Sequence, residues 1–266
     1  MLPPQDIAVG WAPGVVPGLA GGLTFILIWH LAAATGMVGL PTPGEALAAL
    51  AALVVKGDPL YGWTLQQFTW ASLQIVLKGW AASTAVAVPL GLAMGFSLRL
   101  ERVAGGFLEM MRPLPPVAWI PLAYLIFAAF PGPTAWVQTF VVFVGAFFPT
   151  LVTTTEAVKG VDPLYIEAAR TFGASPWQVL SKVVIPAVLP SVITGTRIGL
   201  GVGWMCIVAA EFVGGRKGIG FYIWSVYNVG GRTPEIVAGM VAIGVVGYLA
   251  NRGLLWVEKR LSPWRW

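Results

Sequence analysis

The residues of this 266-residue chain that could do chemistry are few and scattered. The single histidine, His30, lies inside an apolar segment, where it is either a packed helix residue or a proton relay. The chain has no cluster of His, Cys and carboxylates at metal-ligand spacing, no Gly-x-Ser-x-Gly motif and no Gly-x-x-x-x-Gly-Lys phosphate loop. The sequence therefore predicts no catalytic residues and no metal site, and any ATP must be bound by another chain.

A polar, helix-prone segment lies near the middle of the chain, between long apolar segments. Asp162 is suited to cap the N-terminus of a helix, and Pro163 is suited to the first turn. Gly173 is suited to the left-handed residue that often ends a helix. Together these residues predict a short helix of about two turns over residues 164–172.

Four residues of this predicted helix could contact another molecule. Ala168 and Ala169 are small, so a partner surface could approach the backbone closely, and a pair of polar anchors flanks them, Glu167 and Arg170. Residue chemistry alone leaves two alternatives open. The segment is either a docking helix that lies across the end of the fold or an ordinary loop with a helical turn.

The composition around this segment is that of a membrane protein. Hydrophobic residues make up 57% of the chain and charged residues 10%, against about 45–50% and about 25% in soluble domains. The mean hydropathy is +0.80, and no Asp, Glu, Lys or Arg lies between Arg112 and Glu156. A soluble fold would need a more highly charged exterior. The net charge of +5 is spread beside apolar segments, which indicates a lipid bilayer and no nucleic acid as partner.

We expect an all-α integral membrane protein with about six transmembrane helices in a single domain over residues 1–266. The predicted spans are 15–37, 72–98, 117–130, 134–155, 189–213 and 235–256. The proline group that begins after Arg112 cannot sustain an ordinary helix, so the third span is expected to enter through a broken or extended segment. The central polar segment, about 156–186, then forms the loop between the fourth and fifth spans.

The basic residues predict the orientation of the chain. One set lies between spans two and three, between spans four and five, and at the end of span six: Arg99, Arg102, Arg112, Lys159, Arg170, Lys182, Arg252, Lys259, Arg260 and Arg265. The opposite side carries fewer: Lys56, Arg216, Lys217 and Arg232. Because basic loops stay in the cytoplasm, both termini and the central polar segment are expected there.

The central segment also resembles a known motif. Glu167-Ala168-Ala169-x-x-x-Gly173, with Pro186 thirteen residues after the glycine, is similar to the EAA motif of bacterial ABC importer permeases. Val183 and Ile185 stand where that motif usually has Ile and Leu. Residues 112–122, 196–204, 208–211 and 260–264 are similar to permeases for taurine, alkanesulfonates, nitrate and bicarbonate. The resemblance covers about residues 15–265.

The resemblance implies a type I ABC importer permease in the cell inner membrane, crossing it several times. It implies a second permease chain in a homodimer, an external substrate-binding protein, and two cytoplasmic ATP-binding subunits that each receive one coupling helix. The implied coupling residues are Glu167, Ala168, Ala169, Arg170 and Gly173. ATP and Mg²⁺ would be bound by the partner subunits, and this chain would hold no cofactor.

The substrate implied by the resemblance is a small anion, with a sulfonate such as taurine first and nitrate or bicarbonate next. One alternative is a permease of the same class that carries a non-anionic small molecule. A different class, an ion-coupled secondary transporter or a channel, would require charged residues within the spans. The acidic residues of this chain cluster instead at predicted span ends and loops.

Candidate pore residues come mostly from the fifth span and its neighbours. Arg197 could attract an anion, reach the lipid headgroups or pair with a carboxylate. Further polar or aromatic candidates are Trp119, Tyr124, Gln138 and Trp204. The glycines of the fifth span either line the pore or allow close helix packing: Gly195, Gly199, Gly201 and Gly203.

Two further features lie near the predicted outer side. Glu211 is expected to face loop cations such as Arg216 or Lys217 rather than the substrate. The apolar, aromatic segment 218–227 lies outside the predicted spans. It is expected to form a re-entrant helix that gates the pore or a plain interfacial helix.

Overall fold

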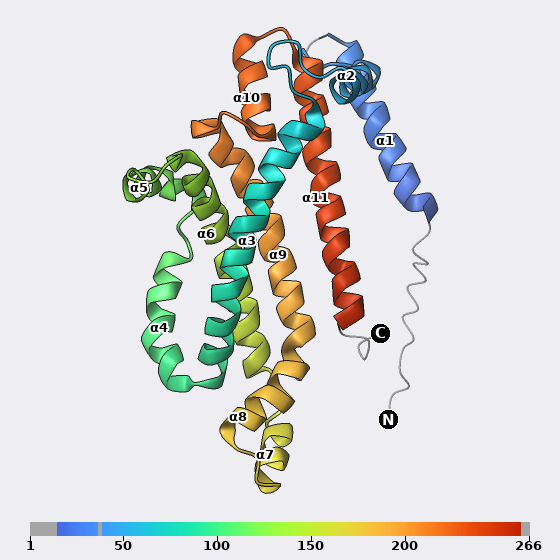
Figure 1. Cartoon of the computed structure of the whole chain (residues 1–266). Coiled ribbons are helices and arrows are strands. Elements are labelled where there is room, and N and C mark those ends of the chain that lie inside the picture. The colour runs from blue at the N-terminus through green and yellow to red at the C-terminus, as the bar shows by residue number, and fades with distance from the viewer. Residues whose placement is uncertain (1–14, 37–38, 262–266) are drawn as a thin grey trace.

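The computed structural model describes residues 15–36 and 39–261, and every regular element within these ranges is helical (Figure 1). The α-helices in chain order are α1 (Val15–Ala34), α2 (Pro43–Val55), α3 (Leu65–Phe96), α4 (Leu98–Met111), α5 (Ile120–Ile126), α6 (Pro133–Lys159), α7 (Pro163–Thr171), α8 (Pro176–Val179), α9 (Ile185–Gly214), α10 (Ile219–Val229) and α11 (Thr233–Leu261). A 3-10 helix, Pro116–Trp119, precedes α5, and a π-helical stretch, Leu180–Val184, joins α8 to α9. The expected all-α fold is confirmed.

Within the described residues, four helices are long and apolar enough to cross a membrane: α3, α6, α9 with its preceding turns, and α11. Even α6, with 27 residues, is about 40 Å long, which exceeds the roughly 30 Å of a hydrocarbon core. α3 begins at Leu65, before the expected residue 72, because Thr64 and Gln67 form a reciprocal capping box. Length and apolar composition therefore confirm four of the expected spans.

The expected third span, 117–130, is wrong as a continuous helix. The 3-10 helix Pro116–Trp119 and α5 together cover only Pro116–Ile126, which is too short to cross a bilayer. Before them, α4 turns back beside the lower part of α3 (Figure 1), where a loop was expected. The prolines that begin at Pro113 separate α4 from the 3-10 helix, so the expectation of a broken entry is confirmed.

The centre of the bundle is α6, which packs against α3 on one side and α9 on the other. Small residues allow these helices to approach closely. A Cβ added at Gly199 would lie 2.8 Å from the carbonyl oxygen of Ala146, and one at Gly79 would lie 2.7 Å from that of Thr139. Tight packing is therefore the role of Gly199, and also of Gly195 and Gly203, whereas Gly201 faces open space.

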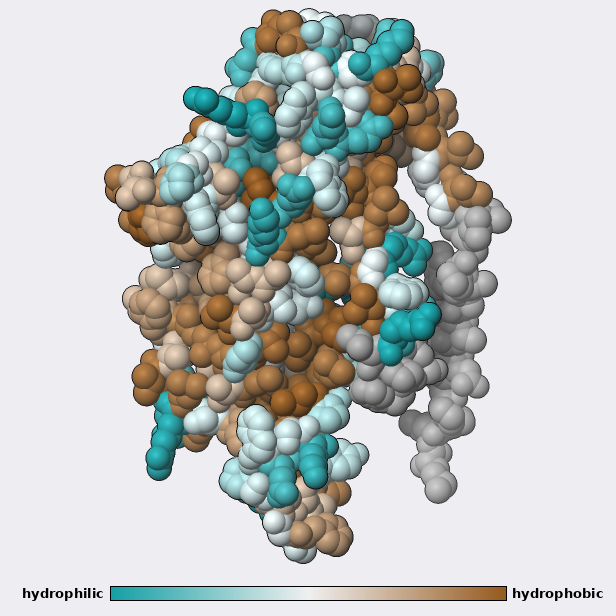
Figure 2. All heavy atoms as spheres, in the orientation of Figure 1, coloured by the Kyte–Doolittle hydropathy of each residue, from teal (hydrophilic) through white to brown (hydrophobic). Residues whose placement is uncertain are grey.

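The surface pattern agrees with a membrane environment. Apolar side chains are exposed along α1, including Leu23, Phe25 and Ile28. In Figure 2, apolar atoms dominate the middle of the visible face, and hydrophilic atoms gather toward the upper part and at the lower tip. Such an apolar band is unfavourable in water and favourable in contact with the lipid of a membrane. His30 lies at the exposed surface of α1, so it is not packed inside this chain.

Candidate functional site

The central polar segment forms α7, a short helix beyond the lower ends of the long helices (Figure 1). The Asp162 carboxylate accepts a hydrogen bond from the backbone N–H of Leu164 at 2.9 Å, and Pro163 occupies the first turn. Gly173 follows the helix with φ of +81°, a left-handed conformation that side chains rarely adopt. The helix, its N-cap and its glycine stop are all confirmed, with bounds shifted by one residue from 164–172.

One face of α7 holds it firmly against the bundle. Ile166 and Ala169 pack on a cluster of buried valines from the end of α6, α8, the π-helical stretch and the start of α9: Val158, Val179, Val184, Val188 and Val192. Immediately afterwards, Ser175 and Gln178 cap α8 reciprocally, at 3.3 Å and 2.8 Å. α7 is therefore packed against the turns that lead into α9, beside the end of α6.

The opposite face of α7 is exposed and partly apolar. Leu164 and Tyr165 are more than half exposed, and Phe172 at the C-cap is 91% exposed. Trp177 on the neighbouring α8 is 71% exposed. The polar residues Glu167 and Arg170 lie on this surface with Ala168, while Ala169 is half-buried. Exposed aromatic side chains on a rigid element outside the apolar band are typical of a protein–protein contact.

The sequence reasoning found Glu167 to Arg170 and missed these larger apolar neighbours. Leu164, Ala168 and Phe172 recur every four residues, so they share one face of the helix. That spacing was the available signal. We call the exposed set Leu164, Tyr165, Ala168, Phe172 and Trp177 the α7 patch.

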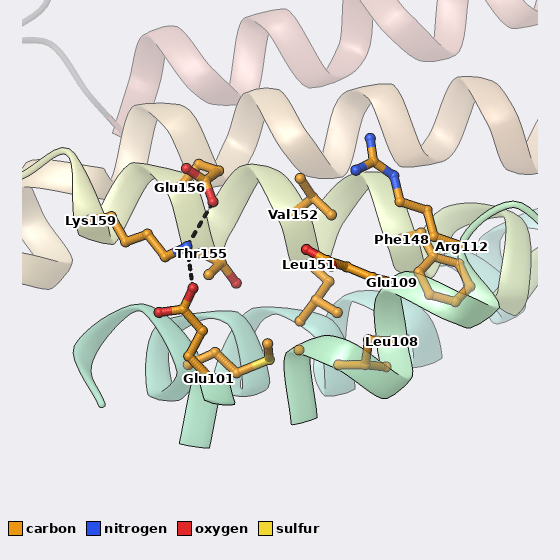
Figure 3. A pocket seen from close by; sticks show the side chains of 12 residues that line it. Glu101, Leu108, Glu109, Arg112, Phe148, Leu151, Val152, Thr155, Glu156 and Lys159 are labelled. Carbon is orange, nitrogen blue, oxygen red and sulfur yellow. Dashed lines mark hydrogen bonds and ion pairs between the residues drawn. The ribbon is translucent and has the colours of Figure 1, made fainter. Parts of the chain in front are cut away.

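A polar pocket between α4 and α6 lies near the point where α6 leads into α7. The Lys159 ammonium is 2.6 Å from a carboxylate oxygen of Glu101 on α4 and 3.0 Å from one of Glu156 (Figure 3). Arg112 lies at the other end of the pocket from Lys159 (Figure 3). Because these side chains are about a third exposed or more, the pairs contribute little stability. Their effect is to orient α4 relative to the end of α6.

Two of the expected pore residues, Arg197 and Trp204, make polar contacts with α11. A guanidinium nitrogen of Arg197 is 3.3 Å from the Glu258 carboxylate on α11, so the pairing alternative applies rather than a free anion site. The indole N–H of Trp204 donates to the carbonyl oxygen of Ile243 at 3.1 Å. Both residues therefore join α9 to α11.

The other three candidates lie near α6. Trp119 meets Phe140 edge-on with ring centroids 6.2 Å apart, and Tyr124 packs on the cluster that contains Val137 and Val141. The indole nitrogen of Trp119 and the amide nitrogen of Gln138 are both buried with no partner among the described residues, and only 3% of Gln138 is exposed. Gln138 lines a cavity at the end of the bundle opposite α7.

The expected position of Glu211 is wrong. Its carboxylate is buried and accepts the Ser72 hydroxyl at 2.6 Å and the backbone N–H of Gly220 at 2.7 Å, and it makes no ion pair with Arg216 or Lys217. The loop after α9 turns back so that the first turn of α10 meets this carboxylate, which satisfies N–H groups of the new helix. The segment 218–227 is confirmed as a separate helix outside the long spans.

No group of three His, Cys, Asp or Glu side chains that could hold a metal ion occurs within residues 15–36 and 39–261. The geometry offers instead a projecting helix at one end of an apolar bundle and a polar cavity at the other. This arrangement suits transport across a membrane powered by a separate protein. It shows no constellation of groups for a reaction carried out by the described residues.

Comparison with known proteins agrees with this arrangement. The chain is 32% identical to the bicarbonate transport system permease protein CmpB of Synechocystis, over 94% of this chain and 89% of the relative. It is 33% identical to the taurine transport system permease protein TauC of Escherichia coli, over 92% and 88%. An inward-facing structure of the MetNI methionine ABC transporter matches with a TM-score of 0.63 and 18% identity, covering 77% of this chain and 99% of that chain, which shows the fold alone.

The family assignment covers most of the bundle. Residues 87–265 match the family of binding-protein-dependent transport system inner membrane components. Members of this class are permease subunits, and the ATPase is a separate subunit, so the alternative of an ion-coupled secondary transporter is wrong. The chain belongs to the binding-protein-dependent transport system inner membrane component family and is a multi-pass permease of an ABC importer.

Proposed function

We propose that α7 is the helix through which a cytoplasmic ATP-binding subunit drives this permease. The observation that carries the proposal is the α7 patch, in which Phe172 is 91% exposed on a helix that Ile166 and Ala169 fix to the bundle. A groove on the partner would bury these apolar side chains, while Glu167 and Arg170 pair at its rim. Because packed interfaces shift between discrete arrangements, movement of the partner would then move α6 and α9.

The assembly that we propose has two copies of this permease, two ATP-binding subunits and one external substrate-binding protein. ATP and Mg²⁺ would be held by the ATP-binding subunits, and this chain would hold no cofactor. The excess of basic residues at the α7 end, including Arg99, Arg102 and Lys182, supports a cytoplasmic location for that end and for both termini. The whole chain, 1–266, would act as one membrane domain.

For the substrate we propose a small anion delivered from outside the membrane. A sulfonate such as taurine comes first, and nitrate or bicarbonate next; a non-anionic small molecule is the alternative. The names of the similar permeases CmpB and TauC, which refer to bicarbonate and taurine, support an anion. Binding measurements on the cognate external binding protein with taurine, nitrate and bicarbonate test this choice directly.

The docking proposal is tested by removing apolar area from α7. Tyr165→Ser with Phe172→Ser is expected to weaken binding of the cognate ATP-binding subunit by at least about tenfold, because two buried aromatic contacts are lost. Glu167→Gln is expected to have a smaller effect, because an exposed polar contact contributes less. Affinity is measured between the purified permease and the ATP-binding subunit.

A matched control comes from the other end of the molecule. Val55 is 77% exposed at the end of α2, so Val55→Ser removes a similar exposed apolar side chain far from α7. This variant is expected to bind the ATP-binding subunit as the wild type does. Unchanged affinity in the Tyr165 and Phe172 double variant would show that α7 is not the docking helix.

A further inference from the structure

A second polar site lies at the end of the bundle opposite α7. A cavity of about 670 Å³ opens there between the upper part of α3, the first turn of α6 and the loop after α9. We call it the basic cavity; its basic and amide side chains are Gln74, Lys78, Gln138, Arg216 and Lys217. Hydrophilic atoms gather over the upper half of α3 in Figure 2, in agreement with this position. The volume is ample for a small hydrated ion.

The positive charge of the basic cavity is not balanced by acidic groups. No carboxylate from residues 15–36 or 39–261 lines it. In the part of the chain that the structure describes, Lys78 and Arg216 form no ion pair. The acidic residue at the end of α9, Glu211, is turned inward to Ser72 and the start of α10. An anion that enters would therefore meet uncompensated cations.

Gln138 supplies a hydrogen-bond donor to the same cavity as these cations. Gln138 lines the cavity and is only 3% exposed. Its amide nitrogen has no hydrogen-bond partner among the described residues. Buried N–H groups are rarely left unpaired, because the loss of water is not repaid. A ligand with acceptor oxygens would satisfy this amide.

The N-terminus of α6 is a third feature of the cavity that favours an anion. Gly132, Pro133, Thr134 and Ala135 line the cavity, and no side chain caps this end of the 27-residue helix. The start of a long helix carries a partial positive charge, which favours an anion. Pro133 has no N–H and Ala135 donates its N–H to the carbonyl oxygen of Gly132, so Thr134 is the residue of this turn whose backbone N–H is left for a ligand. Three independent features, the cations, the buried amide and the uncapped helix, thus converge on one space.

We propose that the basic cavity binds a small oxyanion, of the carboxylate, sulfonate or nitrate type, at the outer entrance of this permease. The Gln138 amide and the first turn of α6 donate to its oxygens, and Lys78 and Arg216 offset its charge. The outer position of this entrance depends on the orientation of the chain in the proposed function. An acidic protein surface fits less well, because the Gln138 amide is buried and a flat surface cannot reach it.

The test is direct binding to the purified full-length chain in phosphate-free maltoside micelles. Nitrate, bicarbonate and taurine are titrated separately at constant ionic strength, and at least one of them is expected to bind. Gln138→Leu, which removes the donor, and Lys78→Gln are each expected to weaken that binding about tenfold. Gln138→Glu is expected to abolish it, because a carboxylate repels the anion. Lys56→Gln removes a cation on the same side but outside the cavity, and is expected to change binding less than twofold.

Three kinds of result would overturn the proposal. The first is that none of the three anions binds the wild type, or that the Gln138 and Lys78 variants bind like the Lys56 control while remaining folded. The second is that the variants keep anion binding and lose affinity for the external binding protein, which would assign the cations to that protein. The third is that phosphatidylglycerol displaces the anion fully, which would assign the site to a lipid headgroup. Docking through α7 is measured separately, so its failure would not be confused with these results.

Discussion

At the scale of single residues, Asp58 is a buried carboxylate outside the membrane-spanning helices that accepts hydrogen bonds from four residues. Its carboxylate accepts the backbone N–H groups of Leu60 at 2.8 Å and Tyr61 at 3.2 Å, the hydroxyl of Tyr222 at 3.2 Å, and the guanidinium of Arg232. Burial alone would raise the pKa of Asp58, but these hydrogen bonds and the charge of Arg232 outweigh it and lower the pKa below its usual value. One carboxylate thus joins the loop before α3 to α10 and α11.

The pH dependence of this network follows from the lowered pKa. An unfolded Asp has a pKa of about 3.9, and the folded value of Asp58 is lower, so its contribution is fully present above about pH 4 to 5. It is lost as the pH falls through the folded pKa. Asp58→Asn is expected to lower the free energy of unfolding at pH 7 by about 3 kcal/mol, because Arg232 loses its buried partner.

Unfolding of the purified chain in detergent, followed from pH 7 down to pH 3, provides the measurement. Wild type is expected to lose more stability than Asp58→Asn below pH 4, since the variant has no carboxylate at this position to protonate. Glu109→Gln, at an exposed position on α4, is the control and is expected to change stability by less than about 0.5 kcal/mol. Equal acid sensitivity of wild type and Asp58→Asn would contradict the role given to Asp58.

At the scale of elements, the contact between α6 and α9 depends on how closely the two backbones approach. A Cβ at Gly199 would lie 2.7 Å from the Thr150 hydroxyl and 2.8 Å from the carbonyl oxygen of Ala146. Thr150 already donates to that carbonyl at 2.8 Å, so neither group can move freely. Gly201, two residues further on, has no atom within 4 Å of an added Cβ. The two glycines therefore form a matched pair.

Gly199→Ala is expected to destabilise the chain by about 1–3 kcal/mol, because the new methyl group forces α6 and α9 apart. Gly201→Ala is expected to be neutral or to stabilise by up to about 1 kcal/mol, because alanine favours the helix and meets no obstacle. Thermal unfolding of both variants in the same detergent gives the comparison. An equal effect of the two substitutions would show that the close approach at Gly199 does not limit the packing.

The elements also show where sequence reasoning succeeds and where it stops. The long helices and α7 were predictable, because apolar length and the signals at Asp162, Pro163 and Gly173 are local. α4 was not, because its charged residues interrupt the apolar pattern and its position depends on the distant contact between Glu101 and Lys159. Neither the partner of Arg197 nor the inward turn of Glu211 could be predicted, since each is set by residues far along the chain.

At the scale of the whole molecule, α6 and α9 connect the two polar ends. α6 begins at the basic cavity and ends just before α7, and α9 begins just after α8 and ends at the loop that carries Arg216 and Lys217. We therefore expect a movement imposed on α7 to reach the walls of the cavity through two packed helices. In the proposed cycle, this connection lets ATP hydrolysis on one side of the membrane change the anion site on the other.

This scheme requires the two ends to lie on opposite sides of the membrane, which thiol labelling can test. The native thiol, Cys206, is buried, so Cys206→Ala gives a background without reactive cysteine. In that background, Lys56→Cys and Phe172→Cys each place one exposed thiol at opposite ends of the bundle. A membrane-impermeant maleimide applied to intact cells that lack the ATP-binding subunits is expected to label Lys56→Cys at once. Phe172→Cys is expected to react only after permeabilisation, because the basic loops beside α7 hold that end in the cytoplasm, and the reverse pattern would invert the proposed direction of transport.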